Sequence, residues 1–189
     1  MKNKTRNLLI TLSILLLLII PFISGYNKMI GLEQGVATSQ ANIDTELKRR
    51  SDLIPNIVNT VKGYAAQESK VIGDVVDARA KLGGAQAIED RANADAELSS
   101  ALSRLLVVVE QYPELKSNEN FRDLSVTLEQ TENRVKIARQ DYNKAISQYN
   151  TAIRRFPNNI VAEIFGFDQK EYYNAPEGAE EVPEVDFTK

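Results

Sequence analysis

A seven-residue repeat in the second half of the chain constrains its fold more than any other feature. Large side chains recur at every seventh position and smaller ones interleave with them: Phe121, Leu128, Val135, Tyr142, Tyr149 and Phe156 in one row, and Leu124, Thr131, Ala138, Ala145 and Ala152 in the other. A 3–4 spacing of this length places both rows on one face of a single helix. We therefore predict one long helix that ends at Pro157 and packs its apolar face against other helices.

Three further stretches have a helical apolar period, over residues 27–50, 53–82 and 88–112. In the first of them Met29, Val36, Ile43 and Arg50 are seven apart, and no stretch alternates as a half-buried strand would. Pro55 is suited to a first helical turn, so a turn is expected at 51–55, with others at 83–87 and 113–119. These connections predict an all-α fold, an antiparallel four-helix bundle preceded by one N-terminal transmembrane helix. A long coiled coil that pairs with another chain is the alternative.

An uncharged apolar run occupies residues 8–24, close to the N-terminus. As a helix, its 17 residues span roughly 25 Å, which is near the lower limit for crossing a bilayer. A cleaved signal peptide is the alternative, but Phe22 or Ile23 stands where a small residue should precede the cleavage site. We therefore predict an uncleaved anchor. Its transmembrane residues would include Leu8, Leu9, Ile10, Leu15, Leu16, Leu17, Leu18, Ile19, Ile20 and Phe22.

Basic residues flank this run unequally. Lys2, Lys4 and Arg6 precede it, whereas Lys28 is the one basic residue close behind it. The positive-inside rule then predicts a single-pass protein of the cell membrane with its N-terminus in the cytoplasm and its bundle outside. The chain divides into an anchor segment (residues 1–25), a bundle domain (residues 26–167) and an acidic tail (residues 168–189), which is expected to be extended or disordered.

Composition excludes several classes of site. The chain contains no His and no Cys, so a Ser-His triad, a disulfide and a thiolate site are ruled out, and structural zinc lacks its usual ligands. The glycine-rich nucleotide-binding motifs are absent as well. Acidic residues outnumber basic ones, 26 to 23, which disfavours binding to nucleic acid. We expect neither a cofactor nor enzymatic activity.

Several polar residues nevertheless lie on or beside the predicted apolar faces. They are Arg50, Glu68, Arg79, Glu110 and Arg139, together with Asn143 and Asn150, which are seven apart. The charged residues can form a buried ion-pair network that fixes helix register, or they can extend to the edge of the bundle. The two asparagines can pack within the core or offer a polar stripe to a partner helix. Catalysis by Glu68 or Glu110 has no other supporting residue in the sequence.

Long segments of the chain resemble the LemA family of bacterial membrane-associated proteins. These segments are KRRSDLIPNIVNTVKGYAAQE at 48–68, the AR pair at 78–79, EQYPELKSNENF at 110–121, EN at 132–133, ARQDYNKAISQYN at 138–150 and RFPNNIVAEIFGF at 155–167. The resemblance runs from Tyr26 to about Phe187. It implies an N-terminal transmembrane segment and a helical bundle, without an established catalytic residue. Gln67 stands where many members have His, which removes the most attractive candidate metal ligand.

The anchor, the bundle pattern and the missing active site together predict a scaffold of the cell envelope. Such a protein contacts the lipid bilayer through residues 8–24 and binds another membrane protein through its bundle. The alternative is an accessory or regulatory subunit of a membrane protease or signalling system. A homo-oligomer is compatible with either role.

Overall fold

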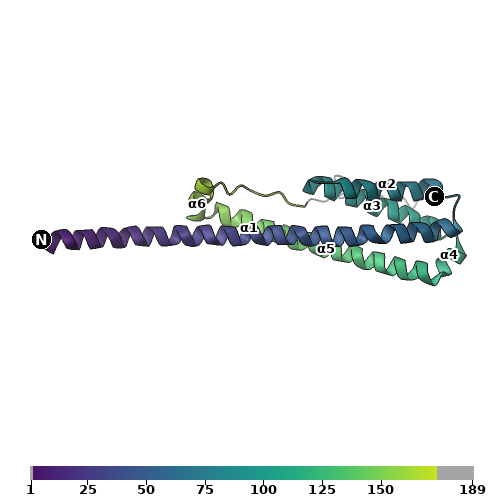
Figure 1. Ribbon diagram of the computed structural model, residues 1–189, viewed down its shortest axis with the longest axis horizontal. Helices are drawn as coiled ribbons and strands as arrows, with labels where there is room; N and C mark the ends of the chain where they lie inside the picture. The colour runs from purple at the N-terminus through teal and green to yellow at the C-terminus, as the bar shows by residue number, and fades with distance from the viewer. Residues whose placement is uncertain (1, 174–189) are drawn as a thin grey trace, which may run out of the picture. The chain divides into compact units, whose positions relative to one another are not determined.

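The computed structural model describes the backbone of residues 2–173, and the side chains of these residues except at positions 2–4, 11, 14–16 and 18. Every regular element in this range is a helix: α1 (Lys2–Tyr64), α2 (Ser69–Gly84), α3 (Ile88–Val109), α4 (Pro113–Ser117), α5 (Glu119–Arg154) and α6 (Asn158–Phe165) (Figure 1). The predicted all-helical class is confirmed for these residues. Of the predicted acidic tail, residues 174–189 lie outside the described part, and residues 168–173 are not helical.

Helix α1 is much longer than the sequence pattern suggested, and the predicted turn at 51–55 is wrong. The helix continues through Pro55 to Tyr64, and the break before α2 falls at residues 65–68. Proline has no N–H group, so the carbonyl of Ser51 loses its partner within the helix. The Nε of Arg79 in α2 donates a hydrogen bond of 2.9 Å to this carbonyl. A side chain from a neighbouring helix thus replaces the bond that Pro55 cannot make.

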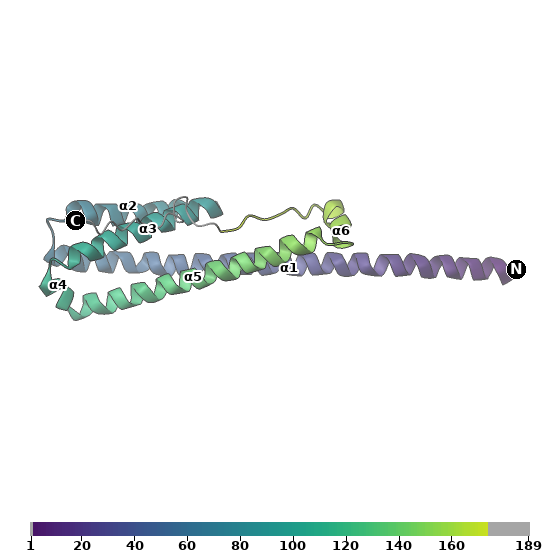
Figure 2. The same ribbon diagram turned by 180° about the vertical axis from the view of Figure 1, so that it is seen from behind.

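The chain divides into two compact units, and both α1 and α5 contribute to each of them. Among the described residues, unit 1 comprises 2–41 and 140–172, and unit 2 comprises 42–139 and Tyr173. Unit 2 is a helical bundle in which α2 and α3 lie side by side, as both views show (Figures 1 and 2). Its core includes the fully buried Val61 of α1, Val75 of α2, Leu105 of α3 and Val135 of α5.

The heptad row of α5 is buried as predicted, with one exception at its end. Phe121 and Leu128 are buried within unit 2, and Tyr142 and Tyr149 are buried within unit 1. Phe156, however, is 81% exposed, because α5 ends at Arg154 and the side chain no longer follows the helical period. The prediction that Phe156 belongs to the apolar seam is therefore wrong.

Unit 1 is assembled around the first part of α1. The end of α5, α6 and residues 166–172 pack there, and Met29, Ile146 and Val161 are buried among them. A Cβ on Gly25 would lie 2.8 Å from the Oδ1 of Asn158, so this glycine permits the close approach of α6 to α1. The ring of Tyr26 also contacts Phe165, at 4.8 Å between centroids.

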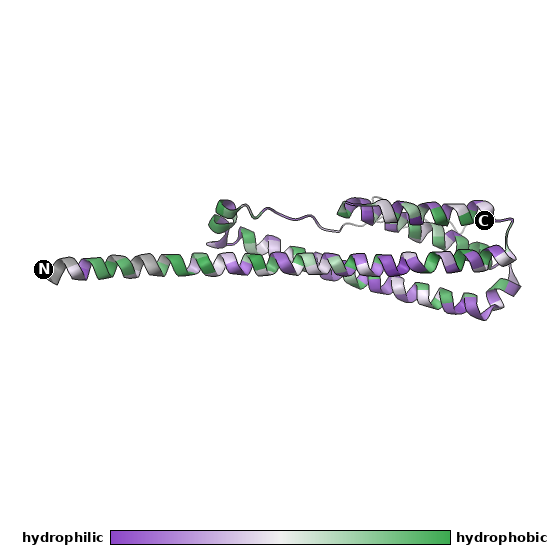
Figure 3. Cartoon of the chain, viewed as in Figure 1, coloured by the Kyte–Doolittle hydropathy of each residue, from purple (hydrophilic) through white to green (hydrophobic). Residues whose placement is uncertain are grey.

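The first part of α1 is strongly hydrophobic (Figure 3). Leu8, Leu9 and Leu17 are 68%, 63% and 70% exposed, and Ile10, Ile19 and Ile20 are exposed as well, whereas Phe22 is half-buried. The side chains of the predicted anchor residues Leu15, Leu16 and Leu18 lie outside the described ones. Considering the described residues alone, none of the helices has the length and apolar character needed to cross a membrane.

Candidate functional site

Four charged side chains meet inside unit 2, and they come from three helices. Arg50 of α1 donates from Nη1 to Oδ1 of Asp95 of α3 at 2.7 Å, and its Nη2 lies 2.5 Å from a carboxylate oxygen of Glu132 of α5. Arg139, also of α5, pairs with the second carboxylate oxygen of Asp95. We call Arg50, Asp95, Glu132 and Arg139 the buried charge cluster. Asp95 is fully buried and Arg50 is only 3% exposed, so two of the four charges are removed from water.

Heptad spacing explains why Arg50 and Asp95 face the interior. Arg50 follows Ile43 by seven positions on α1, and both are buried. Asp95 precedes Leu102 by seven positions on α3, so it lies on that helix's apolar face. Glu132 and Arg139 are themselves seven apart on α5. Arg50 and Asp95 thus stand in apolar rows. Glu132 and Arg139 each lie one position beyond the smaller row of α5, and their side chains remain 44% and 27% exposed.

The buried charge cluster balances two cations against two carboxylates. Burying a single charge is costly unless it is paired and hydrogen-bonded. Burial lowers the pKa of the Arg50 guanidinium from its ordinary value, while the charge and hydrogen bond of Glu132 act in the opposite direction. The pairing keeps Arg50 in contact with anions on two different helices. The cluster thus links α1, α3 and α5 at one level of the bundle.

Tyr173 extends this cluster on the side of Arg139. The guanidinium carbon of Arg139 lies 4.9 Å from the centroid of the Tyr173 ring, a cation–π contact. Burial raises the pKa of the Tyr173 hydroxyl, and the charge of Arg139 opposes that rise. A further ion pair joins Arg91 of α3 to Asp44 of α1. The charged side chains of the cluster, like Arg91 and Asp44, thus all form ion pairs within unit 2.

The other two predicted carboxylates have partners of their own outside the cluster. Glu68 accepts a hydrogen bond of 2.9 Å from the hydroxyl of Tyr112, and Gln67 donates to the same hydroxyl at 2.8 Å. Glu110 forms an exposed ion pair of 2.5 Å with Lys116. Arg79 donates its hydrogen bond to the backbone carbonyl of Ser51. The structure thus joins Arg50 and Arg139 of the predicted polar residues, and gives Glu68, Glu110 and Arg79 separate contacts.

Asn150 holds a segment of its own chain within unit 1. Its Nδ2 donates to the carbonyl of Lys170 at 2.9 Å, and its Oδ1 accepts from the Lys170 N–H at 3.0 Å. The ammonium group of Lys170 pairs with Glu33 at 3.0 Å. Asn143, the other predicted asparagine, is half-buried one heptad earlier on α5. Asn150 therefore fixes the extended residues that follow α6.

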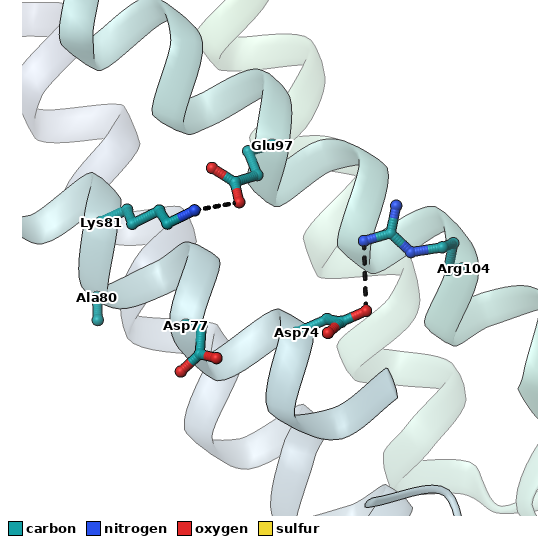
Figure 4. A pocket seen from close by; sticks show the side chains of 6 residues that line it. All are labelled: Asp74, Asp77, Ala80, Lys81, Glu97 and Arg104. Atoms are coloured by element: carbon teal, nitrogen blue, oxygen red, sulfur yellow. Dashed lines mark hydrogen bonds and ion pairs between the residues drawn. The ribbon is translucent and has the colours of Figure 1, made fainter. Parts of the chain in front are cut away.

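A shallow surface pocket lies over α2 and α3, and its lining is largely charged (Figure 4). Lys81 donates to Glu97 at 2.6 Å, and Arg104 lies 3.6 Å from Asp74. These side chains are about half exposed or more in most cases, and solvent weakens such pairs strongly. Within the described residues, no group of His, Cys, Asp or Glu is arranged to hold a metal ion.

Sequence reasoning missed Asp95 and Glu132, which complete the buried charge cluster. The start of the third predicted helix is polar, so the sequence there does not distinguish Asp95 from the other polar residues around it. A signal was nonetheless present, because Asp95, Leu102 and Val109 are seven apart and only the first is charged. A carboxylate in an otherwise apolar row is expected to need a buried cation.

Comparison with known proteins identifies relatives over most of the chain. The sequence model of the LemA family matches residues 39–187. Magnetosome protein MamQ 2 of Paramagnetospirillum magneticum is 28% identical over 177 residues, which cover 78% of this chain and 64% of that protein. MamQ of Magnetospirillum gryphiswaldense is 25% identical over 175 residues, covering 79% and 64%. Protein LemA of Metamycoplasma hominis is 21% identical over 146 residues, covering 75% and 65%.

The match to the MamQ proteins spans just under two thirds of their length. The match to the family extends well beyond half of this chain, and it includes all four residues of the buried charge cluster. The chain belongs to the LemA family.

Proposed function

We propose that this LemA family protein is a non-enzymatic scaffold, held in the cell membrane by the start of α1, whose helical bundle binds another membrane protein. The observation that carries the proposal is the continuity of α1. One helix includes the uncharged apolar run at residues 8–24 and contributes side chains to the cores of both compact units. Such a helix would fix the bundle directly to the membrane without a flexible linker.

The proposed anchor rests on residues 8–24 of the printed sequence, which carry no charge. Five of these positions have side chains outside the described ones, so the exposed side chains are only part of the run. Those that are described include Leu8 and Leu17, both about two thirds exposed. Exposed apolar surface costs about 25 cal/mol per Å² in water, and a bilayer removes that cost. The proposed topology keeps the N-terminus in the cytoplasm and the bundle outside.

The contacts of the polar side chains support the non-enzymatic part of the proposal. General acid–base catalysis needs a group that can reach a substrate and exchange a proton with it. Asp95 is fully buried between two arginines, while Glu68 accepts a hydrogen bond from Tyr112. The names of the MamQ relatives describe a magnetosome protein and specify no reaction. These groups are better suited to fixing helix positions than to turnover.

The anchor is tested by alkaline extraction of membranes from cells that produce the full chain. We expect the protein to stay in the membrane pellet and the double variant Leu17→Arg, Ile20→Arg to be released, since charges near the centre of a span are costly. The matched control is Gln34→Arg, Ala37→Arg, which places the same charges at the same spacing on exposed positions of α1. This control should stay in the pellet. Extraction of the unaltered full chain would contradict the proposed anchor.

A further inference from the structure

We infer that α6 is a second membrane-binding element, which rests on anionic lipid head groups beside the proposed anchor. The surface consists of Phe156, Ile160, Ile164 and Phe165, with Arg154 and Arg155 at its edge, and we call it the α6 lipid face. This inference rests on the anchor of the proposed function. It adds a lipid contact made by a part of the chain some 130 residues after the anchor in sequence.

The position of α6 is fixed against the end of the apolar run. Gly25 directly follows residues 8–24, and a Cβ there would lie 2.8 Å from Asn158 and 3.8 Å from Val161 of α6. Tyr26 contacts Phe165 of α6 and Phe167 just beyond it. In Figures 1 and 2, α1 continues past α6 toward its N-terminus with no other element of unit 1 beside it. A bilayer that surrounds residues 8–24 would therefore end at the level of α6.

Large apolar side chains are exposed on α6 and just before it. Val161 and Ala162 are buried, whereas Ile164 is 64% exposed and Ile160 is 39% exposed. Phe156, just before the helix, is 81% exposed, and Phe165 is 57% exposed although its ring touches Tyr26. Ile160 and Ile164 are one turn apart and share a face of α6, and exposed apolar side chains on a short helix are typical of an element that lies in the membrane interface.

The charge around the α6 lipid face favours anionic lipid as the occupant. Arg154 and Arg155 immediately precede Phe156, and Lys28 lies one turn of α1 beyond Gly25; all three are exposed. Glu163 is the one exposed acidic residue on α6. The chain as a whole carries a net charge of −3, whereas basic residues outnumber acidic ones around the α6 lipid face. Cations beside an exposed apolar surface are attracted to anionic head groups.

The test uses the absence of cysteine from the chain, which allows single labels on the full-length protein. The variants Ile164→Cys, Leu17→Cys and Ser147→Cys each receive an environment-sensitive fluorophore at an exposed position. The labelled proteins are reconstituted into phosphatidylcholine vesicles with or without phosphatidylglycerol, and quenching by spin-labelled lipids is measured. We expect quenching at positions 17 and 164 and none at position 147, which lies on the exposed side of α5. Adding Arg154→Gln and Arg155→Gln to Ile164→Cys should reduce quenching in the anionic vesicles.

The outcomes separate this inference from the proposed function. Quenching at position 17 without quenching at position 164 would overturn the α6 lipid face and leave the anchor in place. No quenching at position 17 would overturn the anchor, and the inference with it. Quenching at position 164 that is equal in the two vesicle types and unaffected by the arginine substitutions would overturn the preference for anionic lipid.

Discussion

Asp95 is a charged residue at the centre of the buried charge cluster of unit 2. It is fully buried, and both of its carboxylate oxygens pair with arginines from other helices. Replacing a whole buried ion-pair network with apolar residues can be neutral, whereas removing one member leaves the others buried without a partner. The four charges therefore stabilise this arrangement of helices relative to arrangements in which they would be separated.

We predict that Asp95→Asn lowers the free energy of unfolding by about 3 to 5 kcal/mol, because Arg50 and Arg139 would lose the anion between them. Urea unfolding followed by circular dichroism measures the change. Glu110→Gln is the control, since it removes a carboxylate from an exposed pair, and its unfolding curve should match that of the unaltered protein. Equal stability of Asp95→Asn and Glu110→Gln would show that the cluster does not hold the helices together.

Tyr173 gives the protein a predicted sensitivity to alkaline pH. Burial raises the pKa of its hydroxyl in the folded state, so the folded protein retains this proton at pH values where the unfolded chain has lost it. Stability from this group is full below about pH 10, the pKa of an unperturbed tyrosine, and is lost as the pH rises through the folded pKa.

We expect Tyr173→Phe to flatten the decline in stability above about pH 10, because phenylalanine has no proton to lose. Urea midpoints measured from pH 8 to pH 11 provide the test. Tyr142 and Tyr149 also have raised pKa values because of burial, so part of the decline should remain in the variant. A decline as steep in Tyr173→Phe as in the unaltered protein would contradict the assignment to Tyr173.

For single residues, the sequence could predict which charges lie near the core but not which partners they contact. Arg50 and Arg139 could be recognised because each is a charge beside an apolar row. Their partners could not be assigned, since a heptad pattern gives the face of a residue but not the helix that it meets. The same limit applies to Asn150, whose two bonds to Lys170 depend on the path of the chain after α6.

Among the elements, α1 shows how tertiary contacts override a local signal. Pro55 predicted a helix start, with a turn over residues 51–55 before it. The helix instead runs through this point because Arg79 satisfies the carbonyl of Ser51. That contact spans 28 positions of sequence and has no signature in the local pattern.

The link between Arg79 and Pro55 predicts an energetic coupling between them. Arg79→Met should lower the free energy of unfolding by about 1.5 to 3 kcal/mol, the usual range for a hydrogen bond from a charged donor. In a Pro55→Ala background the same substitution should cost less, because the introduced alanine supplies the missing N–H to the carbonyl of Ser51. A double-mutant cycle by urea unfolding measures the coupling. Additive effects of the two substitutions would contradict this explanation of the continuous helix.

Helix α5 offers a matched pair of positions for testing its apolar seam. Leu128 is 6% exposed and Val126 is 54% exposed, only two residues away. We predict that Leu128→Asp abolishes cooperative thermal unfolding, since it buries a charge without a partner. Val126→Asp should melt as the unaltered protein does. Similar melting of the two variants would show that the heptad rows do not define the packed face.

At the scale of the whole molecule, the periodicity of the sequence predicted the helical class correctly and the family resemblance agreed with it. The periodicity did not predict the division into two units, because α1 and α5 contribute to both units without a break in their apolar pattern. The heptad pattern assigned Phe156 to the seam, although the structure exposes it, and the pattern did not extend to α6, so the surface that they form could not be predicted. The scaffold proposal unites these parts, with the start of α1 in the membrane and the bundle available to a partner.

The most direct test of this account is crosslinking in intact cells with the tagged full-length chain, followed by mass spectrometry. The chain without residues 1–24 is the control. The account predicts a defined membrane-protein partner that is recovered with the full chain and lost with the control. A loss of that partner's activity on deletion of this protein would identify the role as that of an accessory subunit. Recovery of self-crosslinks alone, or of the same partners without residues 1–24, would contradict the membrane-anchored scaffold.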